Sequence, residues 1–333
     1  MRDRFFVTAF ALVAAAAMAP APAAAQGKAW TTPRTPDGKP DISGTFTFST
    51  ITPLQRPDAL AGKDTLTVQE AAEFEASENK RLNRDLFDPE KGAPSAGYAP
   101  RAQGGVLSYN EFWYERGSQM TKDKRTSLVV DPPSGRIPFT EATMKRNAEN
   151  GRKSNSGFAE SYTDRSLADR CIMGFNSGPP MVSSAYNNNL QILQIPGYVV
   201  ILNEMIHNTR IIPTDGRPHG TLRQYAGDSR GRWEGETLVV DTTNFLRETS
   251  LAGSTANTHL VEKFTRIDKD TIKYEFTVTD STAYTRPWSV EMPLSRTDAQ
   301  LYEYACHEGN YGLYDIMAGQ RAQEKAKAEG KSK

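Results

Sequence analysis

The stretch HLVEKFTRIDKDTIKYEFTVT, residues 259–279, contains two runs in which apolar and polar side chains alternate, separated by the polar residues DKD. Strict alternation is the pattern of a β-strand with one buried face. A hairpin that turns at DKD places Lys263 opposite Glu275, so that opposite charges meet on the outer face of the sheet. The same register places Glu262 on the inner face, among apolar side chains.

The fold class follows from runs of the same kind on both sides of this hairpin. Turn residues separate these runs, and helical patterns do not alternate with them. Further strands are expected in NLQILQI (189–195), GYVVILNEMIH (197–207), ETLVVDTTNF (236–245), WSVEMPL (288–294) and LYEYAC (301–306). We therefore predict a mainly β fold, an antiparallel β-barrel or sandwich with a lipocalin-like meander, an extended N-terminal arm and a few peripheral helices.

The composition divides the chain into four parts. They are a signal peptide (1–25), an extended arm with a surface helix (26–104), a β-barrel domain (105–316) and a charged tail (317–333). In the second part, Thr67 and Glu70 have the spacing of a capping box, which predicts that a helix begins there. In the third part, VLSYNEFWYE (106–115) predicts a strand, and a polar helix is expected within 140–157.

The N-terminus predicts export. Early positive charge in MRDR is followed by the apolar run FFVTAFALVAAAAMA and by Ala23-Ala24-Ala25 as a cleavage site. An uncleaved anchor is the alternative, but prolines interrupt the short apolar run. We expect a periplasmic or secreted protein without stable membrane insertion. The chain carries 40 basic and 40 acidic residues, so its charge gives no indication of a nucleic-acid partner.

Export also determines how the two cysteines are interpreted. Cys171 and Cys306 are the only cysteines of the chain, and an oxidising compartment favours a disulfide between them. The alternative is that Cys306 is a catalytic thiol beside His307.

Glu262 is the first candidate for chemistry. A carboxylate on the inner face of a sheet is costly unless it has a partner. It is either paired with an arginine such as Arg266 or Arg286, or it is a functional acid whose pKa is raised by burial.

The densest group of polar residues lies within VILNEMIHNTRIIP (200–213), where Asn203, Glu204, His207 and Arg210 interrupt an apolar stretch. In a regular strand Glu204 and His207 point to opposite sides, but a bulge between them would bring them together. The functional interpretation is an acid–base histidine oriented by a carboxylate. The alternative is a buried histidine whose hydrogen bonds are satisfied within the core.

His307 is expected at the end of the last strand, because Gly309 allows the chain to turn there. We expect its side chain within about 10 Å of His207, around a shared pocket. Tyr304 and Trp288, with Asn203 and Arg210, are candidates for binding the substrate. Trp288 is equally compatible with a place in the core.

Metal and cofactor sites are not indicated. The four histidines lie in the C-terminal half, so convergence on zinc is conceivable, but HxH, HExxH and CxxC spacings are absent from the sequence. The sequence also lacks a nucleotide-binding glycine motif and a GxSxG elbow. We therefore expect no metal and no cofactor.

Several long stretches resemble an uncharacterised family of exported bacterial proteins. They are PRTPDGKPDISGTF (33–46), RTSLVVDPPSGRIP (125–138), VVILNEMIHNTRIIPTDGRPHG (199–220), GDSRGRWEGETLVVDTTNF (227–245) and EYACHEGNYGL (303–313). The resemblance covers most of the chain after the signal peptide. It implies export and a single domain, and it brings no activity, cofactor or catalytic residue.

The sequence thus predicts a cofactor-free small-molecule enzyme, a lyase, isomerase or hydrolase, on a β-barrel scaffold. Its acid–base groups would be His207, a carboxylate (Glu204 or Glu262) and His307. The alternative is a lipocalin-like carrier whose barrel binds an apolar or aromatic ligand. Fold alone does not separate the two. Two titratable groups that converge on one site would favour the enzyme.

Overall fold

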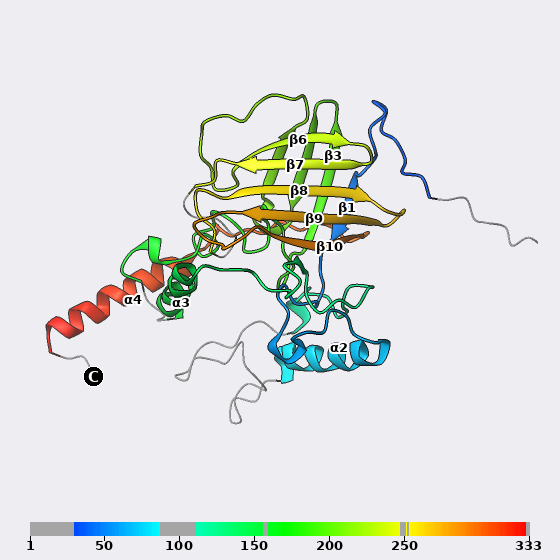
Figure 1. The fold of residues 1–333 in the computed structure, drawn as a ribbon. Helices are drawn as coiled ribbons and strands as arrows, with labels where there is room; N and C mark the ends of the chain where they lie inside the picture. Colours follow the sequence, from blue (N-terminus) through cyan, green and yellow to red (C-terminus); the bar gives the residue numbers. More distant parts are fainter. Residues whose placement is uncertain (1–29, 87–110, 156–158, 247–250, 252, 331–333) are drawn as a thin grey trace, which may run out of the picture. The chain divides into compact units, whose positions relative to one another are not determined.

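The computed structural model describes residues 30–86, 111–155, 159–246, 251 and 253–330, and this part of the chain is mainly β (Figure 1). The strands are β1 (Gly44–Thr47), β2 (Val129–Asp131), β3 (Asn189–Ile195), β4 (Tyr198–Asn203), β5 (Thr209–Pro213), β6 (Asp228–Glu234), β7 (Thr237–Thr243), β8 (His259–Arg266), β9 (Thr271–Thr279) and β10 (Trp288–Arg296). Nine of them form one antiparallel sheet in the order β5-β4-β3-β1-β10-β9-β8-β7-β6, and β2 pairs with β10. The predicted signal peptide lies outside the described residues.

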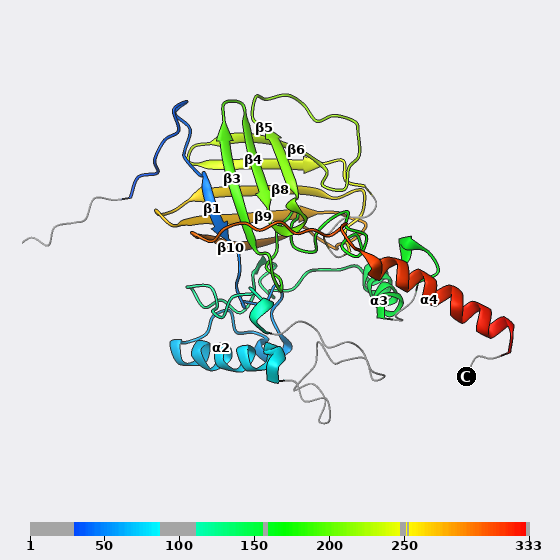
Figure 2. The ribbon, with the colours of Figure 1, turned by 180° about the vertical axis from the view of Figure 1, so that it is seen from behind.

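The β8–β9 hairpin has the predicted register. Lys263 lies opposite Glu275, and Phe264 opposite Tyr274. The sheet curls so that β6–β10 form one wall and β1 with β3–β5 form the opposite wall (Figure 2). The mainly β class is confirmed, and of the two predicted arrangements the structure has the barrel.

The two edges of the sheet meet at a seam between β5 and β6. A Cβ atom built on Gly231 of β6 would lie 3.0 Å from Ile212 Cγ2 of β5 and 2.9 Å from Thr214 Cγ2. These strands are not neighbours in the hydrogen-bonded order of the sheet. The barrel is therefore nearly closed, and side chains close it at this point.

Because Gly231 permits this close approach, Gly231→Ala should lower the free energy of unfolding by about 1–3 kcal/mol through overpacking. The matched control is Gly151→Ala on a helix, where an added Cβ meets no atom within 4 Å. This control should be neutral, or stabilising by up to about 1 kcal/mol. Urea unfolding measures both. Equal stability of the two variants would mean that the seam is not tightly packed.

The inner faces of the strands fill the barrel. Many of the apolar side chains that point inward are at most 1% exposed, among them Phe46, Leu190, Ile192, Ile201, Leu238, Val240, Leu260, Phe264 and Phe276. Side chains that are this completely buried against one another leave no space for a ligand among themselves. This part of the interior is a packed core.

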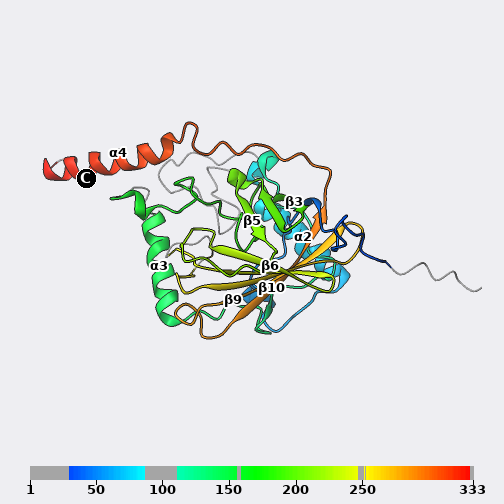
Figure 3. The same ribbon diagram turned by 90° about the horizontal axis from the view of Figure 1, so that it is seen from above.

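The helices are α2 (Val68–Leu82), α3 (Glu141–Asn155) and α4 (Tyr311–Ala328), with short 3₁₀ turns η1 (Asp58–Leu60), η2 (Arg84–Leu86), η3 (Glu111–Trp113), η4 (Tyr162–Asp164) and η5 (Met205–His207). The predicted capping box of α2 is present, since Thr67 Oγ1 accepts from Glu70 N and the Glu70 carboxylate accepts from Thr67 N. Both α3 and α4 lie beyond the barrel end to which β7 and β9 point (Figures 1 and 3). No helix in the described part is long and apolar enough to span a membrane.

Four local features differ from the prediction. The strand predicted at 301–306 is wrong, because this segment has no regular secondary structure and pairs with no strand of the described chain. The arm supplies β1, which is a strand of the sheet between β3 and β10. The strand predicted at 106–115 is wrong for 111–115, of which 111–113 form η3, and 106–110 lie outside the described residues. An ion pair between Glu111 and Arg116 closes this segment at 2.7 Å. The charged tail is helical as far as Ala328.

Candidate acid–base site

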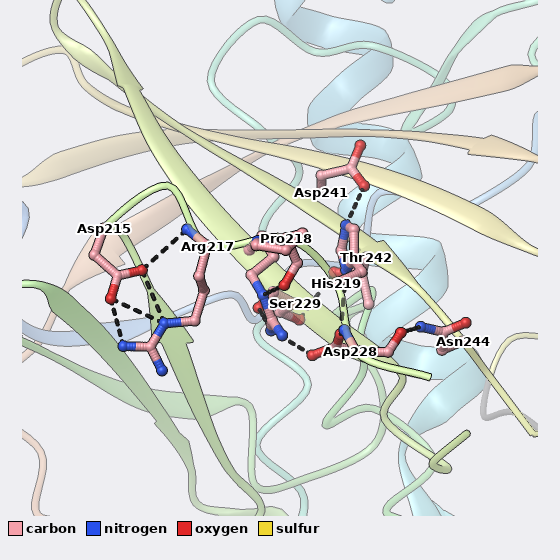
Figure 4. Close-up of polar contacts among 11 residues, drawn as sticks. Asp215, Arg217, Pro218, His219, Asp228, Ser229, Asp241, Thr242 and Asn244 are labelled. Carbon is pink, nitrogen blue, oxygen red and sulfur yellow. Dashed lines mark hydrogen bonds and ion pairs between the residues drawn. The ribbon is translucent and has the colours of Figure 1, made fainter. Parts of the chain in front are cut away.

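Two histidines and two aspartates meet on the outer face of the sheet, at one end of β6, β7 and β8. Asp228 begins β6, Asp241 lies near the end of β7, and His259 begins β8. Because these strands are antiparallel neighbours, the three residues lie at the same end. The loop 214–227, between β5 and β6, adds His219 (Figure 4).

The Asp241 carboxylate bridges the two imidazoles. Its Oδ1 atom lies 2.9 Å from His219 Nε2, and its Oδ2 atom lies 2.7 Å from His259 Nε2. Asp241 points outward because its neighbours on β7, Val240 and Thr242, are buried on the inner face. The side chain of His259 remains 45% exposed, whereas that of Asp241 is 26% exposed. The site is therefore open to a ligand from the His259 side.

Asp228 holds the loop that carries His219. The Nδ1 atom of His219 lies 3.3 Å from Asp228 Oδ2, and the backbone N–H of Gly220 donates to the same oxygen at 2.7 Å. The other carboxylate oxygen of Asp228 accepts from Arg230. Asn244 Nδ2 donates to the Gly220 carbonyl at 2.8 Å, from the end of β7 (Figure 4). These contacts fix His219 in place.

The pKa of Asp241 lies below its ordinary value. Burial alone would raise this pKa, but the hydrogen bonds and charges of His259 and then His219 outweigh that effect. An ionised carboxylate only accepts hydrogen bonds. His219, which has a carboxylate at each ring nitrogen, therefore needs a proton on both nitrogens to donate to both.

His259 differs from His219 in having one ring nitrogen available. Its Nε2–H donates to Asp241, and within the described part of the chain its Nδ1 atom makes no hydrogen bond. In the neutral ring Nδ1 then carries the lone pair. This is the arrangement of a general base: a carboxylate fixes the tautomer of the imidazole, and the opposite nitrogen can take a proton.

No family model and no curated protein matches the chain. Nor is there, among the residues that the structure describes, a group of three His, Cys, Asp or Glu side chains placed to hold a metal ion.

Glu262 lies on the inner face, as predicted, but its partner is a different arginine. Arg210 of β5 donates from Nη1 to Oε2 at 2.5 Å and from Nη2 to Oε1 at 3.0 Å. The hydroxyl of Tyr274 donates to Oε1 at 2.6 Å. The predicted pairing with an arginine is present, but neither Arg266 nor Arg286 is the partner, because Arg210 reaches Glu262 from the opposite wall of the barrel. The pairing favours the structural interpretation of Glu262.

The side chains of Glu204 and His207 form no hydrogen bond or ion pair with each other within the described residues; the His207 backbone N–H donates to the Glu204 backbone carbonyl at 3.1 Å. The chain makes the turn η5 in place of a simple bulge, and His207 has a φ of 43° and is exposed. Glu204 is buried and accepts from Asn189 Nδ2 and from the backbone N–H of Tyr302, both at 3.0 Å. The carboxylate thus ties β3 to the segment that follows β10.

The remaining candidates lie in different surroundings. Asn203 is fully buried in the barrel, as is Trp288, whose ring packs edge-on against Phe276 and Tyr284 in the core. The ring of Tyr304 is half-buried and stacks on Tyr186, with the ring centroids 6.3 Å apart. None of these side chains forms a hydrogen bond or ion pair with His219, Asp228, Asp241 or His259 in the described structure.

The structure decides between the two interpretations of Cys306. Cys171 and Cys306 are bonded, with Cα atoms 5.6 Å apart, which confirms the predicted bridge. Cys306 is therefore not a free catalytic thiol. His307 is exposed, and in the described part of the chain its imidazole makes no hydrogen bond, although its backbone carbonyl accepts from the Asn310 N–H at 3.3 Å.

Proposed function

We propose that this protein is a periplasmic or secreted small-molecule enzyme, a cofactor-free hydrolase, lyase or isomerase, in which His259 is the general base. The observation that carries the proposal is the 2.7 Å contact between Asp241 and His259 Nε2, with Nδ1 of the same ring left available on a half-exposed side chain. Asp241 holds the tautomer and stabilises the imidazolium that forms when Nδ1 takes a proton from the substrate. His219 is a positioning residue, because it holds the other oxygen of Asp241.

The packed interior supports an enzyme over a lipocalin-like carrier. A carrier needs a cavity inside the barrel, whereas the inward-facing side chains fill that space against one another. The disulfide fits an oxidising compartment, in agreement with the export signal expected in residues 1–25. The partner in this proposal is a small molecule bound on the outer face of the sheet; nucleic acid and stable membrane insertion have no part in it.

A substrate screen with matched variants tests the proposal. The wild-type protein, His259→Gln and His307→Gln are compared on esters, lactones and substrates that lose a proton beside a carbonyl. His307 is an exposed histidine outside the acid–base site, so His307→Gln controls for the loss of an imidazole. We expect an activity that His259→Gln lowers by about 10²-fold or more and that His307→Gln retains. An activity that survives in His259→Gln would contradict the assignment of the base.

A further inference from the structure

Residues 297–310, the C-terminal strap, connect β10 to α4 along the wall formed by β1 and β3–β5 (Figure 2). At the ends of the strap, the Thr297 N–H donates to the Thr45 carbonyl of β1 at 3.1 Å, and Asn310 Nδ2 donates to the Asp169 carbonyl at 3.0 Å. Between these ends, three more contacts hold it. The backbone N–H of Tyr302 donates to the buried Glu204, the ring of Tyr304 stacks on Tyr186, and Cys306 is bonded to Cys171. The disulfide is the only covalent contact of the three.

A pocket of about 510 Å³ reaches both sulfur-bearing residues. Cys171 is only 2% exposed, whereas Cys306 is half-buried, so a molecule in the pocket meets Cys306 first. The volume is sufficient for a small thiol. The pocket therefore offers a route to the disulfide in the folded protein.

The walls of this pocket are acidic. Asp169, Glu303 and Glu308 line it, and among the described residues no Lys, Arg or His side chain does. Asp169 is 3.4 Å from Arg165, whereas neither Glu303 nor Glu308 forms an ion pair in the described part of the chain. Such walls repel an anion and accept a neutral or cationic molecule.

We propose that Cys171–Cys306 is a site of thiol–disulfide exchange that selects small thiols without an additional negative charge. The thiolate attacks Cys306 Sγ and forms a mixed disulfide, and the Cys171–Cys306 bond breaks with its electron pair on Cys171. Asn310 Nδ2, 3.3 Å from Cys171 Sγ, donates to this leaving thiolate. A second thiolate then attacks the mixed disulfide and releases Cys306. Two thiols become one disulfide, and two electrons and two protons pass to the cysteines.

Exchange removes the covalent anchor of the strap. The Tyr302–Glu204 hydrogen bond and the Tyr304–Tyr186 stack remain, but neither is covalent, so the strap can then separate from the barrel. Separation uncovers Glu204 while leaving the strands in place. The disulfide thus controls access to this carboxylate.

The test compares two thiols of similar size, cysteamine and 2-mercaptoethanesulfonate, whose thiolate forms differ by two charges. The rate constant of reduction, expressed per thiolate, is measured for each thiol on the native protein, and the cysteamine value is divided by the 2-mercaptoethanesulfonate value. The same ratio is measured on the uncharged 2-hydroxyethyl disulfide. Dividing the first ratio by the second corrects for the different intrinsic reactivity of the two thiols. We expect cysteamine to be favoured by roughly 5-fold after this correction, with the preference falling in 1 M salt. The double variant Glu303→Gln/Glu308→Gln should remove most of the preference, and Glu73→Gln on α2 should retain it.

Hydrogen exchange at the Tyr302 amide reports strap release, and the strand amides of β8 and β9 report whether the barrel stays folded. We expect loss of protection at Tyr302 alone after reduction. The proposal is overturned if the corrected ratio is one in the wild-type protein. It is also overturned if the rate of reduction reaches a limit that no longer depends on thiol concentration and equals the rate of global unfolding. The same holds if the Tyr302 amide and the strand amides of β8 and β9 lose protection together.

Discussion

Glu262→Gln should lower the free energy of unfolding by about 3–5 kcal/mol, because it leaves the Arg210 guanidinium uncompensated inside the barrel. Glu262 is fully buried and Arg210 is 4% exposed, so water cannot solvate the guanidinium that has lost its partner. Burial and the charge of Glu262 also raise the pKa of Tyr274 well above its ordinary value, which keeps its hydroxyl protonated as a donor. Urea unfolding followed by tryptophan fluorescence measures the effect.

Two control variants are measured by the same urea unfolding experiment. Asp215→Asn breaks an exposed pair with Arg217, and solvent screening should make its effect on the free energy of unfolding much smaller than that of Glu262→Gln. The double variant Arg210→Met/Glu262→Leu replaces the buried ion pair with apolar groups and keeps the Tyr274 hydroxyl as the acceptor of the Met181 N–H, so it should recover most of the stability that Glu262→Gln loses. If Glu262→Gln and Asp215→Asn have equal effects, the Arg210–Glu262 pair is not isolated from solvent.

Asp241→Asn should lower kcat/KM of the proposed reaction by about 10²–10⁴-fold. An amide can present its NH₂ group to the imidazole, so the ring of His259 is no longer held with its proton on Nε2. The variant also removes the anion that stabilises the protonated ring. Steady-state kinetics on the substrate found by screening measures the loss, and the midpoint of urea unfolding shows whether the fold is intact.

His219→Gln distinguishes positioning from proton transfer at the same site. Because His219 acts only through Asp241, its substitution should cost less than that of His259, with a partial loss of kcat. Asp215→Asn, on the same loop but outside the acid–base network, should leave both kcat and KM unchanged. A loss in His219→Gln equal to that in His259→Gln would assign a proton-transfer role to both rings.

Alternation in the 259–279 stretch was sufficient to predict the hairpin, its register and the inward direction of Glu262, since these depend on neighbours in the same hairpin. The identity of the Glu262 partner depends on which strands face each other across the closed barrel. Arg210 lies 52 residues away in sequence, so local pairing contains no information about this contact. Arg266 shares the inner face with Glu262, but its guanidinium donates to the backbone carbonyls of Asp41, Asp268 and Lys269.

Only part of the candidate site could be predicted from the sequence. The polar residues at 203–210 stand out because apolar residues surround them in the sequence. In the structure, however, Arg210 pairs with Glu262 inside the barrel and Glu204 binds the backbone of the strap. Asp241 and His259 occupy ordinary outer-face positions, where polar side chains are expected. The register of β7 and β8, with Asp241 opposite Val261, makes Asp241 and His259 diagonal neighbours. The position of His219 depends on the path of a long loop, which alternation does not describe.

The place of β1 in the sheet has a consequence for the order of folding. Gly44–Thr47 pairs with 189–192 on one side and with 295–296 on the other. β1 therefore cannot complete its pairing until β10, which is synthesised much later, has been made. Contacts between such distant parts of a chain close large loops and slow the search for the native state. A nascent chain that still lacks β10 has no partner for this edge of β1. The sheet is therefore completed only after β10 has been made, and until then an unfinished chain exposes the unpaired edge of β1.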